Sequence, residues 1–235
     1  MPVPLAVIFD LDDTLCDTSG SMLTALAAVS QAIPAFARRS PAELYALQTR
    51  IMRALEPQVY SGELTPPQIR VRRFGLMLAE LGHSAEGGEA AATVYRAAYR
   101  ASFRPLAGAG ALLAALKERG LRVGVLTNHL REVQLEVLEA VRLLPLIDAL
   151  VTVSDAPPKP HPGGYRAVCA ALGVSPQQAV MVGDHWTNDV AGAVSAGLNG
   201  VWYAPAELQA PDDSVPHRRL SSYEPLEDAL RAILG

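Results

Sequence analysis

Four aspartates follow directly on a short apolar run near the start of the chain, in the stretch AVIFDLDDTLCDT at residues 6–18. Carboxylates this close together repel one another unless a cation lies among them. A hard divalent cation such as Mg²⁺ accepts several carboxylate oxygens and usually keeps some of its waters. The pattern therefore indicates a metal-assisted site that uses Asp10 and Asp12, while Asp13 is expected to point away from it and Asp17 to have no catalytic role.

Polar residues also follow the later apolar runs of the chain. Thr127 and Asn128 come directly after one run, and Lys159 lies one loop beyond the next. Asp184 and Asp189 come after a third run. Each of these residues alone has an ordinary explanation as a turn residue, a helix cap or a solvated side chain. Because ligands of open parallel sheets bind beyond the carboxyl ends of the strands, we expect the whole set to meet at one edge.

This set of groups suits phosphoryl transfer. One carboxylate can act as a nucleophile and form an aspartyl-phosphate. A second carboxylate, two residues further on, can protonate the leaving-group oxygen and then deprotonate the attacking water. A hydroxyl and a backbone N–H can bind the phosphate oxygens, while a lysine offsets the charge of the transferring group.

The chain resembles the haloacid dehalogenase-like hydrolases in four motifs that stand in the family's order: FDLDDTL (9–15), LTN (126–128), PKP around Lys159 and GDHWTND (183–189). The resemblance covers essentially the whole chain. It implies that Asp10 is the nucleophile and a Mg²⁺ ligand. It also implies that Asp12 is the general acid and base, and that the Asp12 backbone carbonyl binds the metal.

The same resemblance assigns expected roles to the other site residues. Thr127 and the Asn128 amide are expected to bind the substrate phosphate. Lys159 is expected to stabilise Asp10 and the transferring phosphoryl group, and Asp184 to be a metal carboxylate. Asp189 is expected to be a second acid at the metal, acting directly or through a water molecule.

The presence of Asp12 favours a phosphatase over a dehalogenase, since displacing halide needs no protonated leaving group and displacing an alcohol does. A sugar phosphomutase also has both aspartates and stays an alternative. Phosphonate cleavage would need a lysine in the cap, and the two lysines, Lys117 and Lys159, both lie outside the expected cap. A catalytically silent binding or scaffold protein is the non-enzyme alternative.

The substrate is expected to be a small organic phosphate monoester, with a nucleoside monophosphate or a sugar phosphate favoured. The stretch SGELTPPQIRVRRFGLMLAELG (61–82) is similar to nucleotidase and acylneuraminate-9-phosphatase-like members of the family. Phosphoglycolate phosphatases share this type of cap, so phosphoglycolate stays an alternative. Arg70, Arg72 and Arg73 either face the substrate or form an exposed helix face.

The elements that must position these residues alternate between strand and helix, which predicts a doubly wound, Rossmann-like parallel α/β sheet. Strands are predicted at 5–10, 121–126, 149–153, 179–183 and 200–203, with helices at 107–119, 131–143, 163–172, 187–196 and 224–233 and a surface loop at 204–223. An inserted all-α cap at 17–100 carries helices at 22–38, 41–55, 66–81 and 86–101. The α/β core is then formed by residues 1–16 and 101–235.

Composition sets the remaining expectations. The 235 residues are 50% hydrophobic and 19% charged, with a net charge of −4, which argues against a nucleic acid polymer as partner. No signal peptide is recognised, and Thr18–Ala37 reads as an amphipathic helix rather than a membrane span. Two distant cysteines fit a reducing, cytoplasmic compartment, with no membrane partner expected. The oligomeric state stays open.

Overall fold

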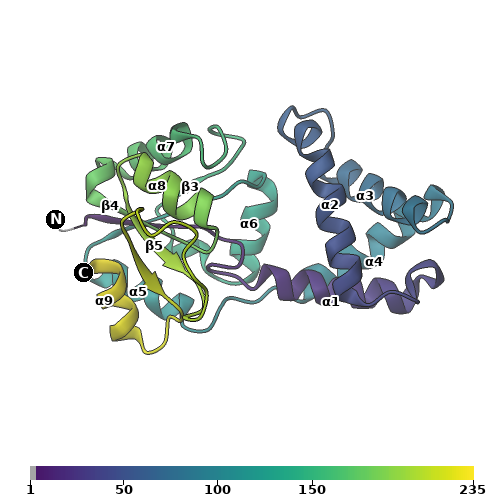
Figure 1. Ribbon diagram of the computed structural model, residues 1–235, viewed down its shortest axis with the longest axis horizontal. Coiled ribbons are helices and arrows are strands. Elements are labelled where there is room, and N and C mark those ends of the chain that lie inside the picture. The colour runs from purple at the N-terminus through teal and green to yellow at the C-terminus, as the bar shows by residue number, and fades with distance from the viewer. Residues whose placement is uncertain (1–3) are drawn as a thin grey trace. The chain divides into compact units, whose positions relative to one another are not determined.

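The computed structural model describes residues 4–235, apart from the side chain of Tyr60, and these residues form two compact units (Figure 1). An α/β unit contains the described residues up to Asp17 together with Arg104–Gly235, and a helical unit contains Thr18–Phe103. The first segment of the α/β unit ends at Asp17 and its second segment begins at Arg104, compared with the predicted boundaries at residues 16 and 101.

The α/β unit is built on a sheet of six strands in the order β3-β2-β1-β4-β5-β6, in which every neighbouring pair is parallel. This sheet confirms the predicted doubly wound α/β class. The strands are β1 (Ala6–Phe9), β2 (Arg122–Leu126), β3 (Ala149–Val151), β4 (Ala179–Gly183), β5 (Asn199–Tyr203) and β6 (His217–Leu220).

Strand β1 lies between β2 and β4, and this order brings three of the sequence motifs together. Phe9, the last residue of β1, pairs with Val125 on one side and with Val182 on the other. All four β1 residues are fully buried, as their apolar, β-branched character predicts. The residues that directly follow β1, β2 and β4 therefore emerge side by side at one edge of the sheet.

Helices cover the sheet and supply the rest of the core. Helices α5 and α9 pack together, as do α7 and α8, and both α5 and α7 contact β2. Tyr165 and Val168 of α7 belong to the same buried cluster as Ile8 and Met181 from the two central strands. The helices are α5 (Ala109–Glu118), α6 (Arg131–Ala140), α7 (Pro162–Leu172), α8 (Gly192–Ser195) and α9 (Leu226–Leu234).

The structure contains one strand that the sequence analysis did not predict. Residues 204–223 are predicted as a surface loop, but they contain β6, which pairs in parallel with β5 from Gly200–His217 to Tyr203–Leu220. The strand reads HRRL, so it lacks the apolar alternation that identifies a strand in a sequence. At the edge of a sheet polar side chains are tolerated, and the Arg219 guanidinium carbon lies 4.6 Å from the centre of the Trp202 ring.

The helical unit consists of α1 (Thr18–Ala32), α2 (Pro41–Tyr60), α3 (Pro66–Glu80) and α4 (Gly88–Ala101). Its own buried core contains aromatic side chains, among them Phe36, Phe74 of α3, and Tyr95 and Tyr99 of α4. Helix α2 begins with a capping box between Ser40 and Glu43. No helix in the described part of the chain is long and apolar enough to cross a membrane.

The chain leaves and re-enters the α/β unit at neighbouring positions. The backbone N–H of Asp17 donates to the carbonyl of Arg104 at 3.1 Å, and the N–H of Leu106 donates to the carbonyl of Leu15 at 2.9 Å. The Arg104 guanidinium also donates through Nε to Oδ2 of Asp17 at 2.8 Å. Both ends of the insertion are thus joined by backbone and side-chain contacts.

Candidate active site

Lys159 lies between two carboxylates at the polar edge of the sheet. Its Nζ donates to Oδ1 of Asp10 and to Oδ1 of Asp189, each at 2.6 Å. Lys159 is 5% exposed and Asp189 is 1% exposed, so these charges interact away from bulk water. Burial lowers the pKa of Lys159, but the two carboxylates more than offset this and the net shift is upward. The ammonium is therefore charged.

The loop that carries Lys159 is held by Asn128. The Asn128 side chain donates through Nδ2 to the carbonyl of Lys159 at 2.8 Å and accepts from the Lys159 N–H at 2.7 Å. These two bonds use both ends of the side-chain amide. The side chain of Asn128 thus orients the lysine. The sequence prediction gave a role only to the backbone amide of Asn128, as a phosphate-binding group.

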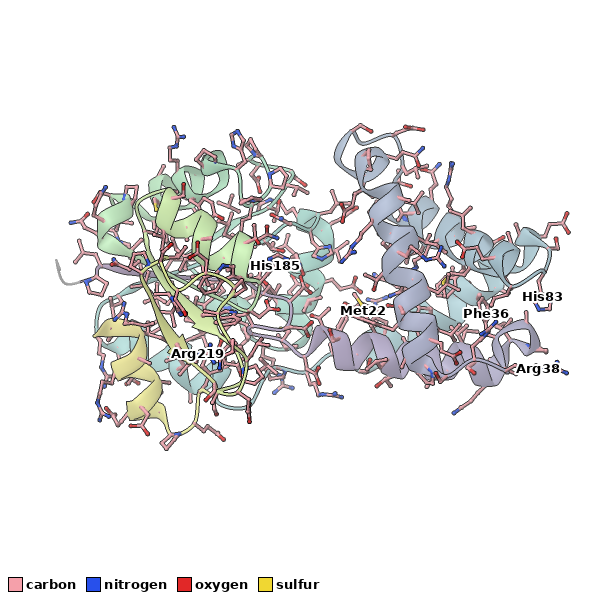
Figure 2. The ribbon with its side chains drawn as sticks, viewed as in Figure 1. Met22, Phe36, Arg38, His83, His185 and Arg219 are labelled. Carbon is pink, nitrogen blue, oxygen red and sulfur yellow. The ribbon has the colours of Figure 1, made fainter. Side chains whose placement is uncertain are left out.

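Asp189 reaches this edge through a wide helical turn that follows β4. A π-helical turn, Trp186–Ala191, replaces the first part of the helix predicted at 187–196. A Cβ at Gly183 would lie 2.3 Å from Cγ of Asp189, so only glycine fits beside the carboxylate. The N–H of His185 (labelled in Figure 2) donates to Oδ2 of Asp189 at 3.0 Å and fixes the other oxygen.

Asp184 is held by residues from both ends of the chain. The Thr14 hydroxyl accepts from the Asp184 N–H at 3.1 Å and donates to Oδ1 of Asp184 at 3.2 Å. The indole N–H of Trp202 donates to the Asp184 carbonyl at 2.8 Å, and the Tyr223 hydroxyl donates to the Thr14 carbonyl at 2.7 Å. The sequence does not single out Trp202 or Tyr223, because each lies far from the motifs along the chain.

Three carboxylates come close enough to share one cation. One oxygen from each of Asp10, Asp184 and Asp189 lies within 4.8 Å of the others. Burial and then the charges of Asp189 and Asp13 raise the pKa of Asp184 to about 6. Within residues 4–235, Asp184 makes no ion pair with a lysine or an arginine. This cluster of carboxylate oxygens, short of positive charge, fits a hard divalent cation.

Asp12 is oriented by a residue that the sequence prediction missed. Nε2 of Gln134 donates to Oδ2 of Asp12 at 2.6 Å and to the hydroxyl of Thr127 at 3.0 Å. Gln134 is 1% exposed, on the face of α6 that also buries Val137 and Leu138. A glutamine at an apolar position of a helix is the sequence signal that could have identified it.

His129 lies on the more open side of Asp12. Its Nε2 is 3.6 Å from Oδ2 of Asp12, and its side chain is 54% exposed. Its backbone N–H donates to the Thr127 hydroxyl at 3.2 Å, which is the second hydrogen bond that this oxygen accepts. Thr127 and Asp12 are therefore linked through Gln134 on the buried side and through His129 on the solvent side.

The structure thus brings six of the predicted side chains into contacts around one sheet edge and adds the Asn128 side chain behind Lys159. The other two aspartates of the opening stretch, for which the sequence predicts no catalytic role, have different surroundings. Asp17 pairs with Arg104 at the junction of the units. Asp13 has a φ of 56°, in the left-handed region, and its charge contributes to the raised pKa of Asp184.

A doubly wound sheet with carboxylates, a lysine and a hydroxyl at its carboxyl edge defines a class of α/β hydrolases. The sequence profile of the haloacid dehalogenase-like hydrolases matches residues 4–197 of the chain. The chain therefore belongs to the haloacid dehalogenase-like hydrolases, which confirms the family that its four motifs predict.

Several relatives with assigned activities are phosphatases. A phosphoglycolate phosphatase from Rhodospirillum rubrum is 35% identical over 211 residues, which cover 83% of this chain and 78% of that protein. An N-acylneuraminate-9-phosphatase from Mus musculus is 28% identical over 235 residues, which cover 97% of this chain and 94% of that protein. The predicted enzyme class, a phosphoric monoester hydrolase, is confirmed.

The fold also has a solved counterpart. YfnB from Bacillus subtilis, solved with magnesium bound, superimposes with a TM-score of 0.77. The two sequences are 22% identical, and the match covers 98% of this chain and 100% of that one. At this level of identity the likeness supports the fold. Members of the family generally use a divalent metal.

Proposed function

We propose that the protein is a Mg²⁺-dependent phosphatase that hydrolyses small organic phosphate monoesters through an aspartyl-phosphate on Asp10. The observation that carries the proposal is that Asp10 and Asp12 have different hydrogen-bond partners. Lys159 bonds to the first carboxylate and Gln134 to the second, at 2.6 Å each. Two aspartates that lie two residues apart thus have different partners, as a nucleophile and a general acid require.

In the proposed first step, a carboxylate oxygen of Asp10 attacks phosphorus, and the bond from phosphorus to the leaving-group oxygen breaks. Asp12 gives its proton to that oxygen, so the product leaves as a neutral alcohol. Thr127 and the Asn128 N–H bind phosphate oxygens. Lys159 stays charged and offsets the negative charge that Asp10 and the phosphoryl group share.

In the second step, Asp12 accepts a proton from a water molecule, whose oxygen attacks the phosphorus of the aspartyl-phosphate. The bond between phosphorus and the Asp10 oxygen breaks, which releases inorganic phosphate and restores the carboxylate. The carboxylates of Asp10, Asp184 and Asp189, with the Asp12 carbonyl, would hold Mg²⁺. The bound cation would lower the negative field that an anionic substrate must enter.

Nucleoside monophosphates and sugar phosphates lead as substrates. Phosphoglycolate is the second candidate, because a phosphoglycolate phosphatase is 35% identical to this chain. A sugar phosphomutase and a silent scaffold protein remain outcomes of the test below. The net charge of −4 supports small-molecule partners rather than a nucleic acid, and we also propose that no membrane is a partner. The two free cysteines support a cytoplasmic location.

The test is phosphate release from an aryl phosphate and from a panel of alkyl phosphates, with Mg²⁺ or with a chelator. We expect release that depends on Mg²⁺ and is abolished in Asp10→Asn. Phosphate release that persists in Asp10→Asn would contradict the role of Asp10 as the nucleophile. Transfer of phosphate within a sugar would support the phosphomutase. A folded wild-type protein that releases phosphate from none of the esters would favour the scaffold protein.

A further inference from the structure

His129 directly follows Thr127 and Asn128, the pair proposed to bind phosphate, and its backbone is held on both sides. The backbone N–H of His129 donates to the Thr127 hydroxyl at 3.2 Å, and its carbonyl accepts from the Val153 N–H at 3.4 Å. The position of the ring is therefore tied to the segment proposed to bind phosphate. The side chain is 54% exposed, so one face of the ring is open to solvent.

The ring of His129 lies beside Asp12 without a direct hydrogen bond to it. Nε2 of His129 is 3.6 Å from Oδ2 of Asp12, which is longer than a hydrogen bond. Within residues 4–235, the ring nitrogens of His129 make no hydrogen bond. An imidazole nitrogen can donate or accept a hydrogen bond. The ring can therefore bind a ligand next to the proposed proton donor.

The opposite side of Asp12 is closed by buried residues. Gln134 donates to Oδ2 of Asp12 at 2.6 Å, and Gln134 and Thr127 are each 1% exposed. A substrate has no access to the Asp12 carboxylate through this side. The leaving-group oxygen must come within hydrogen-bond distance of Asp12 to receive its proton. The leaving group therefore approaches Asp12 on the side that His129 borders.

We propose that the His129 ring binds the leaving group of the substrate, through an oxygen on the carbon next to the ester carbon. This inference rests on the proposed phosphatase function and adds a residue that selects the ester. Oxygens on adjacent carbons lie close together, so the ester oxygen can meet Asp12 while its neighbour meets His129. An apolar leaving group would displace water from the ring without replacing its hydrogen bond.

The test compares two pairs of esters that differ in this one oxygen. Ethylene glycol monophosphate is compared with propyl phosphate, and glycerol phosphate, esterified at a terminal carbon, with trimethylene glycol monophosphate. The second member of each pair lacks the hydroxyl on the carbon next to the ester carbon. The value of kcat/KM is measured for each ester with the wild type and with three variants.

The variants separate the ring nitrogens from the ring itself. His129→Phe keeps an aromatic ring and removes both nitrogens. His129→Gln keeps an N–H donor at about the reach of Nε2. His83→Phe is the control, because His83 is an exposed histidine of the helical unit and is labelled in Figure 2.

A neighbouring hydroxyl also changes the intrinsic reactivity of an ester, so the quantity compared is the ratio of kcat/KM within each pair. In His129→Phe, we expect this ratio to fall by about fivefold to tenfold, the effect of one hydrogen bond. His129→Gln should keep most of the wild-type ratio, and His83→Phe all of it. An unchanged ratio in His129→Phe would overturn the proposal, even if both rates fall, because a role through Asp12 alone affects both esters equally.

Two further measures keep the test decisive. If His129→Phe does not fold, His129→Ala replaces it, since truncating a half-exposed ring leaves no buried cavity. If no ester is hydrolysed, calorimetry with Mg²⁺ on Asp10→Asn, with and without His129→Phe, measures the affinity for each ester. A preference for the hydroxyl ester that disappears with the ring nitrogens would mean that the proposed reaction fails and the His129 contact stands. An unchanged preference would overturn both. If esters are hydrolysed and the ratio does not change, the His129 contact fails alone.

Discussion

At the scale of single residues, the crowded opening stretch divides by its contacts. Asp10 is bonded to Lys159 and Asp12 to Gln134, while Asp17 pairs with Arg104 outside the site. Neighbouring carboxylates coexist because each has its own partner. One prediction tests this division, and a second concerns Asp184.

Asp12→Asn removes the proposed proton donor without changing the size of the side chain. We expect turnover of alkyl phosphates to fall by about a hundredfold or more, as for loss of a general acid. Binding of phosphate and of Mg²⁺ should change little. Steady-state kinetics and calorimetry measure the two properties. An Asp12→Asn protein that still hydrolyses an alkyl phosphate at the wild-type rate would contradict the acid–base role.

Asp184 should make stability depend on pH in the absence of a divalent cation. Its pKa rises from 3.8 to about 6 in the folded protein. Between these values the folded form keeps a proton that the unfolded chain has lost, so stability falls as the pH rises through this window. Thermal unfolding in a chelator should show this decline. Asp184→Asn should reduce the decline, and an undiminished one would assign it to other groups.

At the scale of elements, α6 and the turn after β4 position the groups proposed to act in catalysis. Helix α6 places Gln134 against Asp12 and Thr127 from its buried face. The turn after β4 brings Asp189 back beside Gly183. Each element makes its own prediction.

Gln134→Leu removes the donor that Asp12 and Thr127 share but keeps the shape of the side chain. We expect kcat for alkyl phosphates to fall by about tenfold, the effect of losing one hydrogen bond to a charged group. An aryl phosphate, whose leaving group needs less protonation, should be affected less. Glu139→Gln, on the exposed face of α6, is the control. An equal loss for aryl and alkyl esters would indicate a purely structural role for Gln134.

Gly183→Ala places a methyl group against the Asp189 carboxylate, where a Cβ would lie 2.3 Å from Cγ. Overpacking of this kind costs about 1–3 kcal/mol, so we expect a lower free energy of unfolding. Displacing Asp189 should also weaken Mg²⁺ binding. Chemical denaturation and calorimetry provide the two measurements. Gly110→Ala is the control. A Cβ at this helical position would lie 3.6 Å from Cδ2 of Leu143, so the substitution should be tolerated.

The elements also show how far the sequence predicts the structure. Strands β1 and β4 are continuous apolar runs, and their polar C-terminal residues are identified from the sequence alone. Strand β6 is not identified from the sequence, because its pairing with β5 is a long-range contact that the polar sequence HRRL does not indicate. Gln134 and Trp202 are missed for a related reason: each acts through a partner far away in the sequence.

At the scale of the whole molecule, each unit has its own core. The residues proposed to hold Mg²⁺ all lie in the α/β unit, and the buried aromatic cluster of Phe36, Phe74, Tyr95 and Tyr99 lies in the helical unit. The stability of the helical unit and the Mg²⁺ affinity of the α/β unit should therefore respond separately to substitution.

Leu44→Ala creates a cavity in the helical unit, because Leu44 is fully buried there. The expected cost is about 2–5 kcal/mol in the stability of that unit. Mg²⁺ affinity of the folded protein should stay at the wild-type value. Hydrogen exchange of the helical segments and calorimetry with Mg²⁺ measure the two properties. A parallel loss of Mg²⁺ affinity would show that the two units are energetically coupled.

The hydrogen bonds that join Asp17 to Arg104 and Leu15 to Leu106 have an evolutionary consequence. Two chain ends fastened side by side can accept inserts of different length and shape, because the α/β unit meets the same anchor points each time. Selection can then alter the insert while the α/β unit stays under separate constraint. A lineage with such a junction can diversify by exchanging one segment of its gene.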